Sequence, residues 1–121
     1  MSDKLTDFRQ LNVWQKAHKL VLDVYEFTKK FPKEERTEIV SRMRESSTQI
    51  PIKIAEGFNR RHPKDKEFAY KSAQQAIEEL KYLLILSKDL DFVKDNEEIL
   101  LAAEEVSRML IGLVRSTKNP S

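Results

Sequence analysis

The sequence predicts an all-α fold: a single-domain, antiparallel up-down-up-down four-helix bundle spanning residues 1–121. Only two glycines and four prolines occur in 121 residues, and 35% of the residues are charged, a composition typical of helical proteins with few tight turns. Apolar residues also recur at three- and four-residue steps in four segments separated by short connections, which favours antiparallel neighbours. We expect an ordered core over about residues 8–115 and a frayed C-terminal tail.

The first predicted helix is amphipathic and is expected to stop at Phe31-Pro32. Asn12 and Gln15 stand at the spacing of a capping box. The stripe expected to face the core is Leu11, Trp14, His18, Val21, Tyr25 and Thr28. Since His18 lies within this stripe, we expect it to be a hydrogen-bonded histidine of the core or of an interface rather than a metal ligand.

The second predicted helix begins at Lys33-Glu34-Glu35 and ends at Gly57, with Pro51 in its interior. Its predicted core residues are Ile39, Met43, Ser46, Ile50 and Ile54. Because the apolar spacing continues from Ile50 to Ile54, we predict one helix that is kinked at Pro51. A complete break at Pro51 is the alternative.

A short basic loop at residues 58–63 leads into the third predicted helix, which ends near Asp91. The predicted core residues of this helix are Phe68, Ala69, Ala73, Ala76, Ile77, Leu80, Leu83, Leu84 and Ser87. Asp95 and Glu98 stand at capping-box spacing before the fourth helix. That helix carries the stripe Ile99, Ala103, Val106, Leu110, Leu113 and Val114.

The predicted helices carry more apolar side chains than one face can bury. Five consecutive apolar residues, Tyr82 to Leu86, point in successive directions about 100° apart. Further apolar residues lie beside the predicted stripes: Leu20, Leu22, Phe27, Leu101 and Ile111. We therefore expect an oligomer interface that includes Tyr82, Ile85 and Leu86, since monomers rarely tolerate a contiguous apolar patch. A deeper core is the alternative.

Composition excludes several classes of protein. Without cysteine, the chain forms no disulfide, no thiolate metal site and no cysteine nucleophile, which fits a reducing compartment. The first seven residues lack the apolar stretch of a signal peptide, and no run approaches the roughly 18 apolar residues of a membrane span. We therefore expect a cytoplasmic protein with no membrane partner.

The sequence contains no recognisable catalytic or cofactor motif. A di-iron bundle needs Glu-x-x-His, but Gln15 precedes His18 at that spacing and Asn59 precedes His62. Phosphate-binding loops, dinucleotide fingerprints, nucleophile elbows and zinc spacings are also missing. We predict no enzymatic activity, no metal and no cofactor; an enzyme built on carboxylates alone is the weakest alternative.

A basic cluster is the one feature with a plausible ligand. Residues 1–71 hold 16 basic and 11 acidic side chains, whereas residues 72–121 hold 6 and 9. The predicted nucleic-acid-binding residues gather around the loop between the second and third helices: Lys53, Arg60, Arg61, Lys64, Lys66 and Lys71. These cations suit phosphate oxygens, and Phe58 could stack on an unpaired base. A solvated loop whose charge is partly cancelled by acidic neighbours is the alternative.

Two segments carry a family resemblance that extends from about Phe8 to Leu113. The first is Leu11-Asn12-Val13-Trp14-Gln15-Lys16-Ala17, followed by Tyr25 and Pro32. The second is Ile50-Pro51-Ile52-Lys53-Ile54-Ala55-Glu56-Gly57. The chain resembles the bacterial four-helix bundle proteins encoded in intervening sequences of 23S ribosomal RNA genes. It departs from their pattern at Gln49, Lys53 and Gln75-Ala76, where that family usually has Ser, Asn and Gly-Ser.

The resemblance implies a four-helix protomer, a tendency to form homopentameric rings and no established enzymatic activity. It also implies a distant likeness to the accessory proteins of diversity-generating retroelements, which work with a reverse transcriptase and RNA. We therefore expect a homo-oligomer, a pentamer by this resemblance, that binds RNA or another nucleic acid. A protein–protein adaptor for a partner such as a polymerase is the alternative.

The second segment also has a structural interpretation. Pro51 would bend the helix, Ala55 would allow close packing, and Gly57 would supply the left-handed residue that ends it. Glu56 could orient Arg60 through a pair four residues apart.

Overall fold

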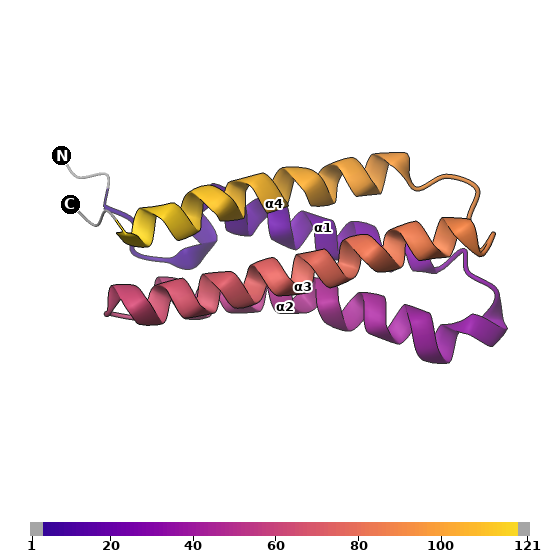
Figure 1. The fold of residues 1–121 in the computed structure, drawn as a ribbon, viewed down its shortest axis with the longest axis horizontal. Helices are drawn as coiled ribbons and strands as arrows, with labels where there is room; N and C mark the ends of the chain where they lie inside the picture. Colours follow the sequence, from indigo (N-terminus) through magenta and orange to yellow (C-terminus); the bar gives the residue numbers. More distant parts are fainter. Residues whose placement is uncertain (1–3, 119–121) are drawn as a thin grey trace.

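The computed structural model describes residues 4–118, apart from the side chains of residues 35–37, and contains helices but no strands over that range (Figure 1). The four long helices are α1 (Asn12–Thr28), α2 (Ser41–Phe58), α3 (Pro63–Asp89) and α4 (Glu97–Lys118). The prediction of an all-α chain with four helices is confirmed. None of the described helices is both long enough and apolar enough to cross a bilayer.

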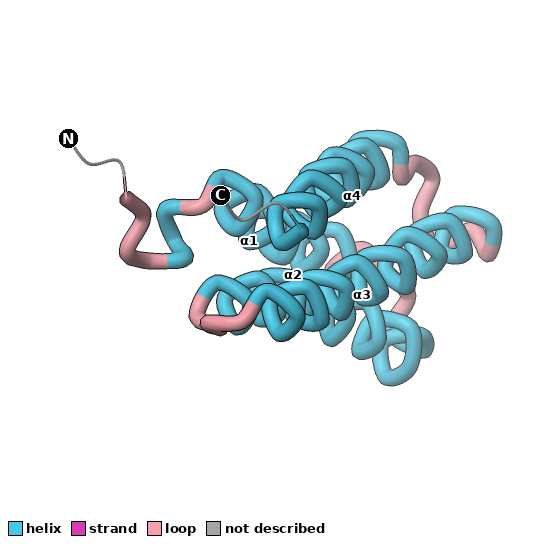
Figure 2. The backbone as a smooth tube through the Cα atoms, turned by 60° about the vertical axis from the view of Figure 1, so that its left-hand side comes forward, coloured by secondary structure: helices cyan, strands magenta, loops and turns pink. Residues whose placement is uncertain are grey.

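Each long helix packs against two others: α1 and α3 both contact α2 and α4. Consecutive helices run in opposite directions along the long axis (Figure 1), and the connections lie at the ends of the helices (Figure 2). The α2–α3 connection therefore lies at the same end of the molecule as the start of α1 and the end of α4 (Figure 1). This end carries the predicted basic cluster.

The core is one continuous apolar cluster to which all four helices contribute. Its largest fully buried apolar side chains are Leu20, Met43, Ile50, Ile54, Ile77, Leu80, Leu84 and Leu110. The predicted stripe of α2 is buried throughout. The stripes of α3 and α4 are buried except at Phe68, which is exposed, and at Ala76 and Leu113, which are half-buried.

The predicted stripe of α1 was wrong by about one residue in register. The buried residues are Val13, Ala17, Leu20, Val21, Val24 and Thr28. Tyr25 and His18 are exposed, and the His18 ring stacks on the half-buried Trp14 ring with centroids 5.2 Å apart. His18 is therefore not a core histidine. Rings with polar atoms lie at the edge of this helix's buried face, where their polar ends reach water.

The caps around α1 also differ from the prediction. The capping box is not formed by Asn12 and Gln15 but precedes the helix: Asp7 Oδ1 accepts from the Arg9 N–H, and Gln10 Oε1 accepts from the Asp7 N–H. The Gln15 amide instead donates to the Arg9 carbonyl at 2.8 Å. A short 3-10 helix, Phe8–Gln10, thus leads into α1.

The approach to α2 is helical but irregular. A 3-10 helix, Lys33–Glu35, is followed by a π-helix, Arg36–Val40, before the regular helix begins at Ser41. The prediction that a regular α-helix begins at Lys33 was therefore wrong. α1 already ends at Thr28, before the predicted stop at Pro32.

α2 continues through Pro51, so a complete break there is wrong. Just before the proline, three hydroxyls donate to carbonyls three residues earlier: Ser46 to Met43, Ser47 to Arg44 and Thr48 to Glu45. Such back-bonding is common in bent helices. The kink at Pro51 stays a prediction.

Gly57 lies inside α2, which ends only at Phe58, and no glycine in the described range has a positive φ. The prediction that Gly57 ends the helix in a left-handed conformation was wrong. The structural reason for a glycine here is the ring of Tyr70, which occupies the space where a Cβ would lie.

α3 ends where the sequence predicts, in a Schellman motif. Asp91 has a φ of 64°, its N–H donates to the Lys88 carbonyl, and the Phe92 N–H donates to the Ser87 carbonyl. Asp95 Oδ1 then accepts from the Glu97 N–H, two residues on, rather than at the predicted capping-box spacing.

α4 continues to Lys118, three residues beyond the predicted ordered core. Thr117 is buried and its hydroxyl donates to the Val114 carbonyl. The rest of the predicted frayed tail, residues 119–121, lies outside the described residues.

Candidate nucleic-acid interface

The α2–α3 connection and the first turn of α3 expose three cations close together in the chain: Arg60, Arg61 and Lys64. Within residues 4–118, none of the three forms an ion pair with a described side chain. Their charge is thus not neutralised by direct contact, and phosphate oxygens can approach them without displacing a carboxylate.

The other predicted cations are already engaged. Lys53 Nζ pairs with Glu56 at 3.2 Å, and Lys71 Nζ pairs with Glu67 at 3.1 Å. Hydrogen bonding to Lys71 is the main reason that the pKa of the Glu67 carboxyl lies below its usual range. Because Glu56 pairs with Lys53, the predicted Glu56–Arg60 pair is wrong.

Lys66 closes the C-terminal end of α2. Its ammonium donates to the Gly57 carbonyl at 3.1 Å and to the Phe58 carbonyl at 2.9 Å, both of which lie at the end of the helix. Burial lowers the pKa of Lys66. These contacts give Lys66 a structural role in joining α2 to α3.

A groove of about 360 Å³ runs between the end of α2 and the start of α3. Its lining residues are Lys53, Glu56, Arg60, Asp65, Phe68, Ala69 and Ser72. Two cations and two carboxylates thus line it beside one large apolar ring. On the other side of the loop, Arg61 lines a second groove of about 290 Å³ with Tyr70 and Thr117.

The ring predicted to stack on a base, Phe58, is not the accessible aromatic side chain at this end of the molecule. Phe58 is half-buried, and the Lys66 ammonium lies 5.8 Å from its ring centroid. Phe68, which was predicted to be buried, is 76% exposed. Phe68 was predicted to be buried because it directly precedes Ala69, but adjacent side chains on a helix point about 100° apart. The charged residues Glu67 and Lys71 were the signal that the side of α3 that carries Phe68 faces solvent.

The predicted oligomer interface is partly accessible. Tyr82 and Ile85 are exposed, whereas Leu86 is half-buried and packs against the core. Of the apolar residues beside the predicted stripes, Leu20 is buried and Phe27 half-buried, whereas Leu22, Leu101 and Ile111 are exposed. Exposed apolar side chains therefore lie on α1, α3 and α4.

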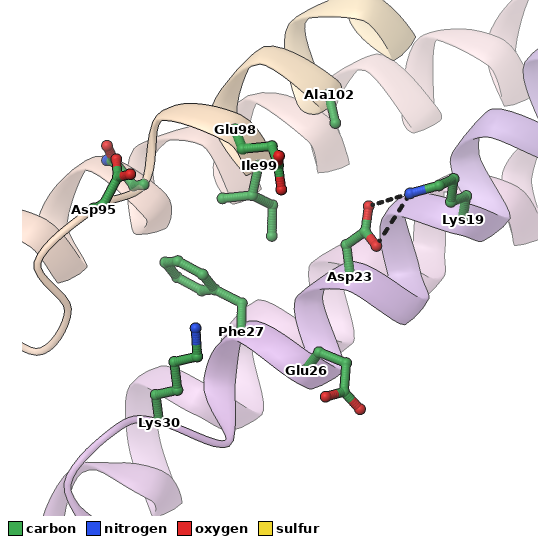
Figure 3. A pocket seen from close by; sticks show the side chains of 10 residues that line it. Lys19, Asp23, Glu26, Phe27, Lys30, Asp95, Glu98, Ile99 and Ala102 are labelled. Atoms are coloured by element: carbon green, nitrogen blue, oxygen red, sulfur yellow. Dashed lines mark hydrogen bonds and ion pairs between the residues drawn. The ribbon is translucent and has the colours of Figure 1, made fainter.

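A groove of about 450 Å³ lies between α1 and α4 (Figure 3). Acidic side chains outnumber lysines along it, and Lys19 Nζ is bonded to the Asp23 carboxylate at 3.1 Å. Among the described residues, no group of three or more His, Asp or Glu side chains is placed to hold a metal ion. The mixed charge of this groove makes it a poorer site for a polyanion than the α2–α3 end.

Comparison with protein families identifies the family of the chain. The family model described as 23S rRNA-intervening sequence protein matches residues 9–112, which include α1, α2, α3, the larger part of α4, both resemblance segments and the basic loop. No curated protein matches the chain.

Proposed function

The chain belongs to the 23S rRNA-intervening sequence protein family, and we propose that it is a non-enzymatic, homo-oligomeric protein that binds RNA or another nucleic acid. In this proposal the protomer is an antiparallel up-down-up-down four-helix bundle. The loop between α2 and α3 contacts the phosphate backbone.

The observation that carries the proposal is the exposed, unneutralised charge of Arg60, Arg61 and Lys64. Cations that contact phosphates release counterions, so each contact strengthens binding and makes it depend on salt. Three contacts from one protomer are few for tight binding. A ring of protomers would repeat the loop around its axis and strengthen the electrostatic attraction.

Exposed apolar side chains support the oligomer. Tyr82 is 60% exposed, and Ile85 lies one helical turn away on α3. Burying such residues between protomers removes apolar surface from water, worth roughly 25 cal/mol per Å². We propose a pentamer as the oligomer.

The test is a triple variant, Arg60→Ser, Arg61→Ser and Lys64→Ser, assayed for binding to a labelled single-stranded RNA over a range of salt concentrations. We expect at least tenfold weaker binding and a salt slope reduced by roughly 0.7 for each lost phosphate contact. The matched control is Lys30→Ser, Lys88→Ser and Lys94→Ser, which removes the same charge from the opposite end of the helices. Equal effects of the two triple variants would contradict a specific site.

A protein–protein adaptor is the second candidate, favoured by the exposed apolar ring of Tyr82. Its partner would be a protein such as a polymerase. A protein that copurifies with the chain, survives nuclease treatment and is lost with Tyr82→Ser and Ile85→Ser would favour this function over nucleic-acid binding.

A further inference from the structure

Phe68 is the most exposed large apolar side chain among residues 4–118, although it lies on a helix with a well-formed buried face. A phenyl ring in water gains nothing for folding, because the hydrophobic effect rewards only area removed from water. The ring is therefore available to a partner that would cover it.

The surroundings of Phe68 indicate the chemistry of that partner. Lys64 and Ser72 lie four residues before and after it, on the same side of α3. Arg60 lines the groove beside it. The ring thus has two exposed cations close by, neither of them in an ion pair with a described residue.

We propose that Phe68 is a stacking platform for an unpaired base, with Arg60 and Lys64 binding the flanking phosphates. The ligand is then a single strand or a loop rather than a duplex. This inference rests on the proposed function and specifies its ligand. Aromatic rings beside cations are how proteins hold single strands, since every base has a face to stack once it is no longer covered by its neighbours.

The carboxylates of the groove fit a base better than a phosphate. Asp65 lines the groove and forms no ion pair with any other residue that the structure describes, while Glu56 is already bonded to Lys53. A phosphate beside Asp65 would be repelled, but the carboxylate can accept hydrogen bonds from the amino group of a base edge. The base is therefore placed in the groove and the phosphates on its basic rim.

Other aromatic side chains lack this combination. Phe58 is half-buried beneath Lys66. Tyr82 is exposed on the same helix, but the lysine next to it, Lys81, is paired with Glu78 at 3.3 Å. Because Tyr82 belongs to the proposed oligomer interface, the control is Leu90, an exposed apolar side chain at the other end of α3.

The test compares Phe68→Ala, Phe68→Leu, Phe68→Trp and Leu90→Ala by fluorescence anisotropy. The probes are a labelled 12-nucleotide RNA of mixed sequence, DNA of the same sequence, and the RNA duplex. We expect Phe68→Ala and Phe68→Leu to weaken single-strand binding about tenfold, in the range measured for stacked bases. Phe68→Trp and Leu90→Ala should keep it, and duplex binding should be unchanged. Equal losses of affinity for single-stranded RNA and DNA would support stacking without a preference for either strand. A loss of affinity for RNA alone would support stacking and identify RNA as the ligand.

Four results would overturn the inference. Wild-type affinity of Phe68→Ala, while the Arg60, Arg61 and Lys64 triple variant loses binding, would remove the stacking but leave the proposed function standing. Wild-type affinity of Phe68→Leu would show an apolar contact without a requirement for an aromatic ring. A changed oligomeric mass of Phe68→Ala would make Phe68 an interface residue. Failure of the wild-type protein to bind any probe would overturn the proposed function as well.

Discussion

The ring of Tyr70 in α3 packs against the backbone of Gly57 in α2 so closely that a Cβ at residue 57 would lie 2.3 Å from Tyr70 Cε1. Tyr70 is itself buried, and burial raises the pKa of its phenol. The glycine that closes the Ile50–Gly57 segment thus allows two helices to approach each other just before the basic loop. It positions the loop through packing rather than through a turn.

Replacing Gly57 with alanine should destabilise the protein by about 1–3 kcal/mol, because the buried ring has little room to move. The control is Gly112→Ala in α4, where an added Cβ meets nothing within 4 Å. That change should stabilise the protein by roughly 0.5–1 kcal/mol, since alanine is the better helix former. Urea unfolding measures both, and equal stabilities of Gly57→Ala and wild type would contradict the packing explanation.

Arg44 joins α2 to α1 through two contacts. Its guanidinium carbon lies 4.4 Å from the Tyr25 ring centroid, and its Nε donates to the buried Thr28 hydroxyl at 3.1 Å. We expect Arg44→Ala to reduce the free energy of unfolding by about 1–2 kcal/mol. Arg42→Ala is the control, because its pair with Glu79 is exposed and 3.6 Å long and should contribute under about 0.5 kcal/mol. Thermal unfolding in which Arg42→Ala is the less stable of the two variants would contradict the stabilising role of the Arg44–Tyr25 contact.

Lys66→Met should lower stability by about 1 kcal/mol but leave RNA affinity within about twofold of wild type. The reason is that the ammonium is bonded to the carbonyls of Gly57 and Phe58 rather than presented to a ligand. Lys64→Met should do the opposite, with unchanged stability and weaker binding. Differential scanning calorimetry and anisotropy on both variants separate these roles, and a loss of affinity without a loss of stability in Lys66→Met would return Lys66 to the binding site.

The N-terminal cap should titrate at low pH. Hydrogen bonds from Arg9 lower the pKa of Asp7 from its ordinary 3.8 to about 2. Since the folded pKa is the lower one, the stabilisation by this cap is complete above about pH 4 and is lost as the pH falls through about 2. In an NMR titration, the backbone amide resonance of residue 9 should report that midpoint. In Arg9→Ala the midpoint should shift toward pH 3.8. A midpoint near 3.8 in the wild type would contradict the cap.

Asp91 adopts a φ of 64°, which costs energy for any residue with a Cβ. We expect Asp91→Gly to raise the free energy of unfolding by roughly 0.5–1 kcal/mol, whereas Asp89→Gly, inside the last turn of α3, should lower it by a similar amount. Chemical denaturation of the pair provides the measurement. Destabilisation by both glycines would mean that position 91 does not hold this conformation in solution.

Much of the fold could be predicted because the sequence marks it locally. The interior residues of α2 keep three- and four-residue spacing on both sides of Pro51, and Ile50 and Ile54 are both fully buried. The buried stripe of α1 was wrongly predicted because Trp14, His18 and Tyr25 have the spacing of residues that share one helix face. Their polar atoms favour the edge of the core, and which residues of α1 lie at that edge depends on how α1 packs against α2 and α4.

The candidate site was less predictable, because it depends on which partners the folded chain brings to each cation. Sequence proximity grouped Lys66 with Arg60 and Lys64, yet only the path of the loop brings its ammonium to the end of α2. Local spacing also could not show that Glu56 would pair with Lys53 rather than with Arg60. The exposure of Phe68 likewise follows from how α2 and α3 pack.

The most direct test of nucleic-acid binding by an oligomer is light scattering on the purified protein, combined with the 260/280 nm absorbance ratio before and after nuclease treatment. The proposal predicts a high initial ratio that falls with nuclease, and a protein mass near five times 14.2 kDa. A monomer that carries no nucleic acid at any stage would contradict it.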